Sequence, residues 1–178
     1  MSIARASARA IVLTITATIT TSCNADRALS PADYEGVYPL LQVNDHDLGW
    51  YNDVNGECQV AFTAGSLILA SGEATGKKQF LFRVNYNVRC LGVDPFDGSG
   101  FLDVRGTDVK PADGKLVLNG FGPDMITGLG ADRWTLEVRP IGSNLDVRIW
   151  GLNGQLWSDP VFIMGPKQPY TGPCIFGC

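Results

Sequence analysis

The sequence predicts an all-β fold, a single antiparallel up-and-down β-barrel, with a β-sandwich as the alternative. Segments with apolar residues at every second position recur along the chain, and dipeptides typical of tight turns lie between them. No convincing amphipathic helix follows the first 22 residues. A barrel has the further advantage over a sandwich that its closure leaves no strand edge open.

The chain begins with the features of a secretory signal peptide. Arg5 and Arg9 precede an apolar segment, residues 10–19, and small residues lead into Cys23. This apolar run is too short to cross a bilayer as a helix, which takes about 20 residues. We therefore expect residues 1–22 to be a signal peptide and residues 23–33 to be a polar tether.

Cys23 is the expected lipid anchor. The small residue before it resembles the lipobox of bacterial lipoproteins, in which the mature chain starts at a diacylated cysteine, although the usual leucine three positions earlier is Thr20 here. The alternatives are cleavage after Ala25 and an uncleaved apolar N-terminus. Lipidation implies a location in the cell envelope, at the outer membrane or cell surface, with lipid as the only membrane contact. Plain cleavage implies a secreted or periplasmic protein.

The clearest strand prediction is FLFRVNYNVRC, residues 80–90, in which apolar and polar residues alternate from Phe82 to Cys90. Alternation of this length indicates one buried and one solvated face. The same pattern predicts strands in ECQVAF, GKLVLNG, DRWTLEVRP and NLDVRIWG, and further strands are expected at residues 36–43, 66–70, 100–105 and 155–164. Together they form one barrel domain, residues 34–165, followed by a Pro/Gly-rich tail, residues 166–178.

Tight turns are expected where Asn-Gly or Asp-Gly dipeptides tolerate a positive φ. These are Asn55-Gly56, Asp97-Gly98, Asp113-Gly114, Asn119-Gly120 and Asn153-Gly154.

Cysteine usage agrees with export. With Cys23 set aside as an anchor, an even number remains for disulfides in an oxidising compartment, namely Cys58, Cys90, Cys174 and Cys178. Cys58 and Cys90 lie on the apolar phase of their strands, so a bridge between neighbouring strands is possible, and the other two would then close a small loop in the tail. Pairing of the tail with the barrel is the alternative. Zinc is disfavoured because its sites prefer two close cysteine pairs.

Charge and length exclude several classes of protein. Removal of residues 1–22 takes two arginines from the 14 basic residues and leaves 12 against 18 acidic ones, a net charge of −6 on 156 residues. This length suits one domain. An acidic chain without basic clusters is a poor ligand for nucleic acid, so no nucleic-acid partner is expected.

The stretch YEGVYPLLQVNDHDL, residues 34–48, precedes a strand with Cys58, a GSLIL strand and a strand ending at Cys90. This arrangement resembles the lipocalin-like domains of bacterial secreted lipoproteins. Such domains open with a Gly-x-Tyr or Gly-x-Trp strand, here Gly36-x-Tyr38, and continue as a small antiparallel barrel. The resemblance covers residues 34–90 best and fades after about Gly120. It implies an extracytoplasmic barrel.

The sequence contains no pattern of a common catalytic, metal or cofactor site. His46 is the single histidine, it lies in an expected turn, and no Gly-x-Ser-x-Gly elbow occurs. The segment DPFDGSG, residues 94–100, lacks the spacing of a calcium loop and is expected to be a turn. We therefore expect no catalytic residue, no metal and no cofactor.

The glycine-rich segment 120–130 lacks a phosphate-binding pattern. Its apolar residues Met125, Ile126 and Leu129 are the candidate ligand-binding residues, as a flap over the mouth of the barrel. Packing against the end of the barrel is the simpler interpretation. Trp134 is expected in the core, whereas three tryptophans fall outside the apolar phases and could form a contact surface: Trp50, Trp150 and Trp157.

Three functions are compatible with these patterns. The first is a non-catalytic barrel that binds a small apolar ligand or an envelope protein. The second is a structural or inhibitory envelope protein with a filled barrel and an outer recognition surface. The third is an enzyme with an unrecognised carboxylate pair. An internal cavity of several hundred Å³ would favour the first function, and a filled interior the second.

Overall fold

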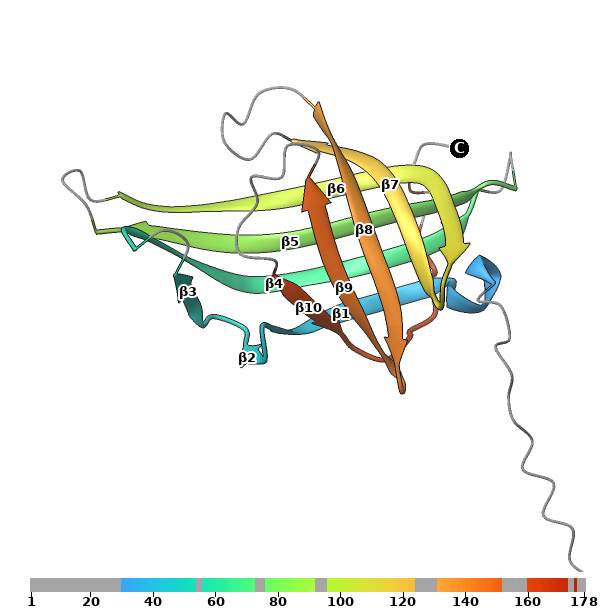
Figure 1. Cartoon of the computed structure of the whole chain (residues 1–178), viewed down its shortest axis with the longest axis horizontal. Helices are drawn as coiled ribbons and strands as arrows, with labels where there is room; N and C mark the ends of the chain where they lie inside the picture. The colour runs from blue at the N-terminus through green and yellow to red at the C-terminus, as the bar shows by residue number, and fades with distance from the viewer. Residues whose placement is uncertain are drawn as a thin grey trace, which may run out of the picture.

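The computed structural model confirms the predicted fold class, because the chain closes into an antiparallel β-barrel (Figure 1). The structure describes residues 30–53, 56–72, 76–91, 96–123, 131–151 and 160–172 together with residue 175. The expected signal peptide and most of the expected tether lie outside these residues. The described strands, with one short 3-10 helix, are η1 Pro31–Tyr34, β1 Gly36–Val43, β2 His46–Asp47, β3 Tyr51–Asp53, β4 Cys58–Ser71, β5 Lys78–Cys90, β6 Phe96–Ala112, β7 Lys115–Pro123, β8 Ala131–Ile141, β9 Asn144–Gly151 and β10 Val161–Met164.

Strand β1 closes the barrel because its two halves pair with different neighbours. Its first half, Gly36 to Pro39, pairs with β4, and its second half, Leu40 to Val43, pairs with β10. Strands β4 to β10 follow one another in the sheet, each antiparallel to the next, so eight of the described strands form an up-and-down ring rather than a sandwich. In Figure 1, β4, β5 and most of β6 run along the long axis while β7, β8 and β9 cross them steeply.

The interior of the barrel is filled with apolar side chains from the predicted inward phases. In β5, Phe80, Phe82 and Val84 are fully buried, as their alternation predicts. The Phe162 ring of β10 packs edge-on against Phe82 and Phe62, with ring centroids 5.3 and 5.1 Å apart. Further fully buried side chains come from β4 and β6–β10: Leu67, Val104, Leu116, Leu118, Leu136, Val138, Val147 and Met164.

A bulge explains why one long strand looked like two in the sequence. The predicted strands ECQVAF and 66–70 are both part of β4, and the register with β5 shifts between Phe62 and Ala64. The extra residue lets Phe62 and Leu67, which are an odd number of positions apart, both point inward. Two separate strands were therefore the wrong prediction for this segment.

Two of the predicted turns are wrong. Asp97-Gly98 pairs with Arg89 and Val88 inside β6, so this strand is much longer than the predicted segment 100–105. Asn119-Gly120 lies inside β7, where a Cβ on Gly120 would press against the Arg105 carbonyl and the Phe80 ring. Gly120 therefore permits close packing rather than a turn.

Other turns are confirmed. Asp113 and Gly114, with φ values of 44° and 71°, form the two-residue turn between β6 and β7. Asn44 and Asp45 do the same between β1 and β2, which leaves His46 exposed as expected. The expected turn at Asn153-Gly154 lies outside the described residues, and so does Asn55. Beyond β10, Gln168 of the expected tail pairs with Val37 of β1.

Candidate functional site: a groove on the outer face

The larger of the described hollows lies on the outside of the barrel. It is a groove of about 740 Å³ along β6 and β7, and we call it the β6–β7 groove. Its lining consists of Phe101, Asp103, Arg105, Gly106, Thr107, Asp108, Asn119, Phe121, Gly122 and Pro123. Leu102, Val104 and Leu118 of the same strands point inward and are buried, so the charged and aromatic groove residues between them face outward.

A local irregularity of the sheet forms the groove. The register between β6 and β7 shifts between Arg105 and Asp108, where β6 has one residue more than β7 and bends. The residues of β6 that precede Arg105 pair with β5 and have no partner in β7. The groove is thus the outer surface around this irregularity of the two strands.

Two exposed phenylalanines form the apolar part of the groove. The exposed fractions of Phe101 and Phe121 are 61% and 54%. An arginine from a neighbouring strand lies near each ring, with guanidinium-to-centroid distances of 5.7 Å for Arg83 on Phe101 and 5.9 Å for Arg133 on Phe121. Exposed aromatic rings gathered in a concave surface are typical of a binding site.

Both carboxylates of the groove are engaged by cations. Arg83 donates to both oxygens of Asp103, which is only 6% exposed. Asp108 pairs with Lys110 at 2.8 Å and accepts from the Asn119 amide at 3.0 Å. The Lys110 hydrogen bond, helped by Asn119, lowers the pKa of Asp108. A general acid needs the opposite shift, because it must keep its proton near neutral pH.

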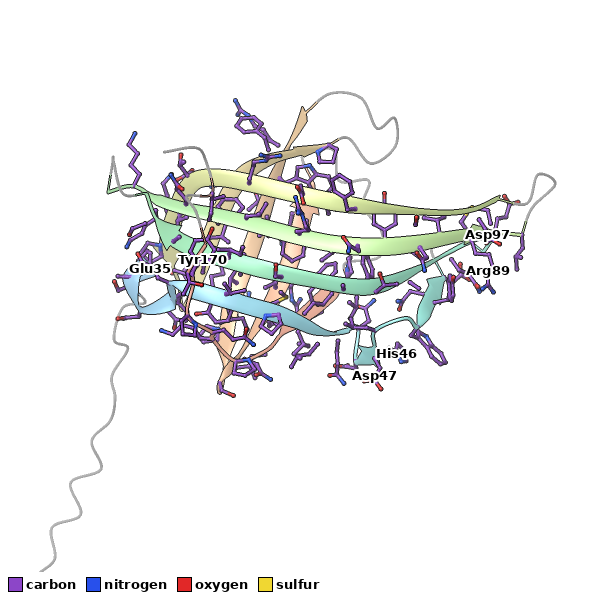
Figure 2. All side chains as sticks on the ribbon, turned by 180° about the vertical axis from the view of Figure 1, so that it is seen from behind. Glu35, His46, Asp47, Arg89, Asp97 and Tyr170 are labelled. Carbon is purple, nitrogen blue, oxygen red and sulfur yellow. A yellow bond between two sulfur atoms is a disulfide. The ribbon has the colours of Figure 1, made fainter. Side chains whose placement is uncertain are left out.

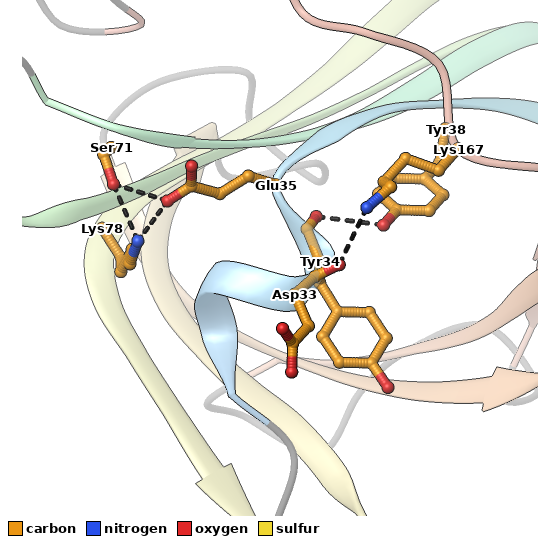
Figure 3. A network of polar contacts seen from close by, with 7 residues as sticks. All are labelled: Asp33, Tyr34, Glu35, Tyr38, Ser71, Lys78 and Lys167. Carbon is orange, nitrogen blue, oxygen red and sulfur yellow. Dashed lines mark hydrogen bonds and ion pairs between the residues drawn. The ribbon is translucent and has the colours of Figure 1, made fainter.

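A second hollow, of about 330 Å³, lies at the end of the barrel that carries η1, between Glu35, Leu69, Ser71 and Tyr170. Figure 2 labels Glu35 and Tyr170 at this end. The Glu35 carboxylate accepts hydrogen bonds from Lys78 and from the Ser71 hydroxyl (Figure 3), and these bonds lower its pKa. Glu35, Ser71 and Lys78 are hydrogen-bonded to one another, so we assign these three residues to closing the barrel end.

A group of aromatic side chains with one arginine lies at the opposite end of the long strands, where Figure 2 labels His46 and Arg89. We call it the aromatic ledge, and it consists of His46, Trp50, Tyr51 and Arg89. The rings of His46 and Trp50 stack with centroids 4.8 Å apart, and the Arg89 guanidinium lies 4.3 Å from the Tyr51 centroid. Arg89 also lies 3.7 Å from Asp97. The expected exposure of Trp50 and Trp150 is confirmed at 58% and 44%, whereas Trp134 is 4% exposed, as expected for the core.

Among the predicted site residues, the structure confirms one pair. Cys58 and Cys90 form a disulfide between the neighbouring strands β4 and β5. The others lie outside the described residues, namely Cys23, Met125, Ile126, Leu129, Trp157, Cys174 and Cys178. Pro123, which lines the β6–β7 groove, lies two positions before Met125 in the chain.

Phe101 and Phe121 were missed in the sequence. Each is an aromatic residue on the polar phase of its strand, beside Asp103 and Asn119, and that departure from the alternation was the available signal. Alternation alone assigns such residues to the solvated face of a strand and does not distinguish them from ordinary surface residues.

Across the described ranges, no group of three or more histidine, cysteine, aspartate or glutamate side chains is placed to hold a metal ion. In the same part of the chain, no helix has the length and apolarity needed to span a membrane.

Comparison of the chain with models of known protein families, with curated proteins and with solved structures found no match.

Proposed function

We propose that this protein is a non-catalytic binding barrel that acts outside the cytoplasm, attached by a lipid on Cys23 or secreted, and that an apolar ligand binds in the β6–β7 groove. The observation that carries this proposal is the pair of exposed phenylalanines, Phe101 and Phe121, in a groove of about 740 Å³. Pockets for small ligands are typically about 300–1,000 Å³ in size.

The packing of the barrel favours an outer site over an inner one. The side chains that fill its centre, such as Phe80, Phe82 and Phe162, have almost no exposed surface. Binding in the interior would require them to move, which costs packing energy. The groove needs no such rearrangement, and its carboxylates, each held by a cation, support a role in binding rather than catalysis.

A titration with N-phenyl-1-naphthylamine, an uncharged probe that fluoresces in apolar sites, tests the proposed site. We expect saturable binding to the wild-type protein and at least about tenfold weaker binding to the variant F101A/F121A, because each ring contributes about 1.5–3 kcal/mol when buried. The matched control is Ile141→Ala, since Ile141 is 55% exposed but lies outside the groove, at the end of β8 beside the β8–β9 turn. Unchanged affinity in F101A/F121A would refute the groove as the site.

The proposed location has its own test. The intact mass should be measured for the protein from the membrane and soluble fractions of its host, before and after reduction. A membrane-bound species that starts at Cys23 and carries acyl mass supports lipid anchoring. An unacylated soluble species supports secretion, and a species that retains residues 1–22 contradicts both.

The aromatic ledge favours a second candidate function, the recognition of an envelope protein. Trp50 is more exposed than Trp150 and stacks on His46 at one end of the molecule. A photo-crosslinking residue placed at position 50 should then trap one discrete partner in the envelope, whereas the same residue at position 150 should not. Equal crosslinking at the two positions would exclude the ledge as a specific surface.

A further inference from the structure

We propose that the ligand of the β6–β7 groove is a small organic anion with an apolar body, whose acidic group is bound by Arg105 and Arg133. This inference rests on the proposed function and specifies the chemistry of the ligand.

The sheet register places the two arginines on either side of an exposed ring. Arg105 of β6 pairs with Phe121 of β7, and Phe121 pairs with Arg133 of β8. All three side chains are on the outer face and exposed. Neighbouring strands lie about 4.8 Å apart, so the row Arg105–Phe121–Arg133 spans roughly 10 Å. An anion whose body stacks on Phe121 is then within reach of a guanidinium at either side.

The other charges of the groove are already paired. Arg83 is bound to Asp103, and Lys110 to Asp108. Arg105 and Arg133 have no carboxylate partner among the described side chains. Among the described side chains, the groove and its rim therefore hold four cations, Arg83, Arg105, Lys110 and Arg133, against two carboxylates. This local charge of +2 belongs to a chain whose formal net charge is −4.

The surplus of positive charge indicates that the ligand carries an acidic group. Positive charge gathered in a concave surface attracts anions, and complementary charge is the usual basis of orientation and specificity. Guanidinium groups match carboxylates especially well because their planar N–H groups donate two parallel hydrogen bonds. With Phe101, Phe121 and Pro123 as apolar wall, the groove suits an aromatic or aliphatic carboxylate better than a neutral lipid.

Two related probes separate the anionic group from the apolar body. 8-Anilinonaphthalene-1-sulfonate has the same ring system as N-phenyl-1-naphthylamine with a sulfonate added. We expect the double variant R105Q/R133Q to weaken binding of the sulfonate about tenfold or more, as for loss of charged hydrogen bonds, and to change binding of the neutral probe less than about twofold. Added salt should weaken only the sulfonate.

The matched control is Arg139→Gln, because Arg139 lies on the same outer face of β8 at the far end of that strand, next to Glu137. It should affect neither probe. R105K/R133K, which keeps both charges, should recover a large part of the sulfonate affinity. Circular dichroism and the urea midpoint should be measured for each variant, since the sulfonate also binds partly unfolded chains.

Each outcome decides a different point. A loss of less than about twofold for the sulfonate in R105Q/R133Q, or equal losses for both probes, overturns the proposed anion site while the apolar groove stands. Absence of binding of the neutral probe to the wild-type protein refutes the proposed function itself. Displacement of the sulfonate by 1-naphthoate supports a small-molecule carboxylate, whereas displacement by an acidic peptide alone contradicts it.

Discussion

Cys58 and Cys90 are direct register partners at one end of the long β4–β5 ladder and are joined by a disulfide. The bond lies next to the ledge of Trp50 and Tyr51, because β3 pairs with the residues of β4 that follow Cys58. It therefore fixes the end of the molecule that is farthest from η1.

Replacement of both cysteines by alanine should lower the free energy of unfolding by about 3.7 kcal/mol, the chain-entropy value for a loop of 33 residues. Urea unfolding of the wild-type protein and of C58A/C90A measures this loss. A reductant should lower the stability of the wild-type protein toward that of the variant. A further loss when the variant itself is reduced would reveal another disulfide.

The ion pair of Arg83 with Asp103 should contribute more to the free energy of unfolding than the exposed ion pairs do, because Asp103 is only 6% exposed. Arg83→Met leaves this carboxylate without its partner and should cost about 1–3 kcal/mol, a range that allows for the half-exposed arginine. Lys110→Met is the control, since the Lys110–Asp108 pair is exposed and should cost about 0.5 kcal/mol or less. Similar costs in urea unfolding would contradict this ranking.

Glu35 should make stability depend on pH in the acid range. Hydrogen bonds from Lys78 and Ser71 lower its pKa below the ordinary value of 4.5, so the folded state favours the carboxylate. This stabilisation is complete above that value and is lost as the pH falls through the lowered pKa. Its size should be about 0.5 kcal/mol, because the group is partly exposed.

The measurement is the free energy of unfolding between pH 7 and pH 3 for the wild-type protein and Glu35→Gln. The difference between the two proteins should shrink as the pH falls. A constant difference over this range would show that the ionisation of Glu35 does not contribute.

Trp134 should tolerate phenylalanine but not alanine. Its indole Nε1 is buried and has no hydrogen-bond partner among the residues that the structure describes, which leaves a donor unsatisfied. Trp134→Phe removes this penalty of about 1–3 kcal/mol and offsets the lost apolar area, so its net cost should stay below about 1 kcal/mol. Trp134→Ala should cost about 3–5 kcal/mol. Equal destabilisation of the two variants in thermal unfolding would disprove this role for the N–H group.

The regular parts of the fold were predictable because a strict alternation has only one structural interpretation. Strand β1 matches its predicted range, residues 36–43, and the inward residues of β5, β7, β8 and β9 match theirs. The predictions failed where a long-range contact outweighs a local signal. Gly120 looks like a turn residue, but its role is to let β7 approach Arg105 and Phe80.

The β6–β7 groove was harder to predict than the fold. Its shape depends on the shift of register after Arg105, which no local pattern indicates. The net charge of the groove depends on which basic side chains are paired with a carboxylate. That pairing follows from contacts between neighbouring strands, such as Arg83 with Asp103. The aromatic residues on the polar phase, Phe101 and Phe121, are the one feature of the groove that the sequence displays, and they were not predicted as site residues.

The groove faces outward from a barrel whose interior is solidly packed, and this separates two kinds of evolutionary constraint. Substitutions of Leu102 or Val104 act on the core, whereas substitutions of the flanking Phe101 or Arg105 act on the surface alone. A chain built in this way can change the shape and charge of its outer face by exchanging alternate residues of two strands, while the same barrel continues to fold.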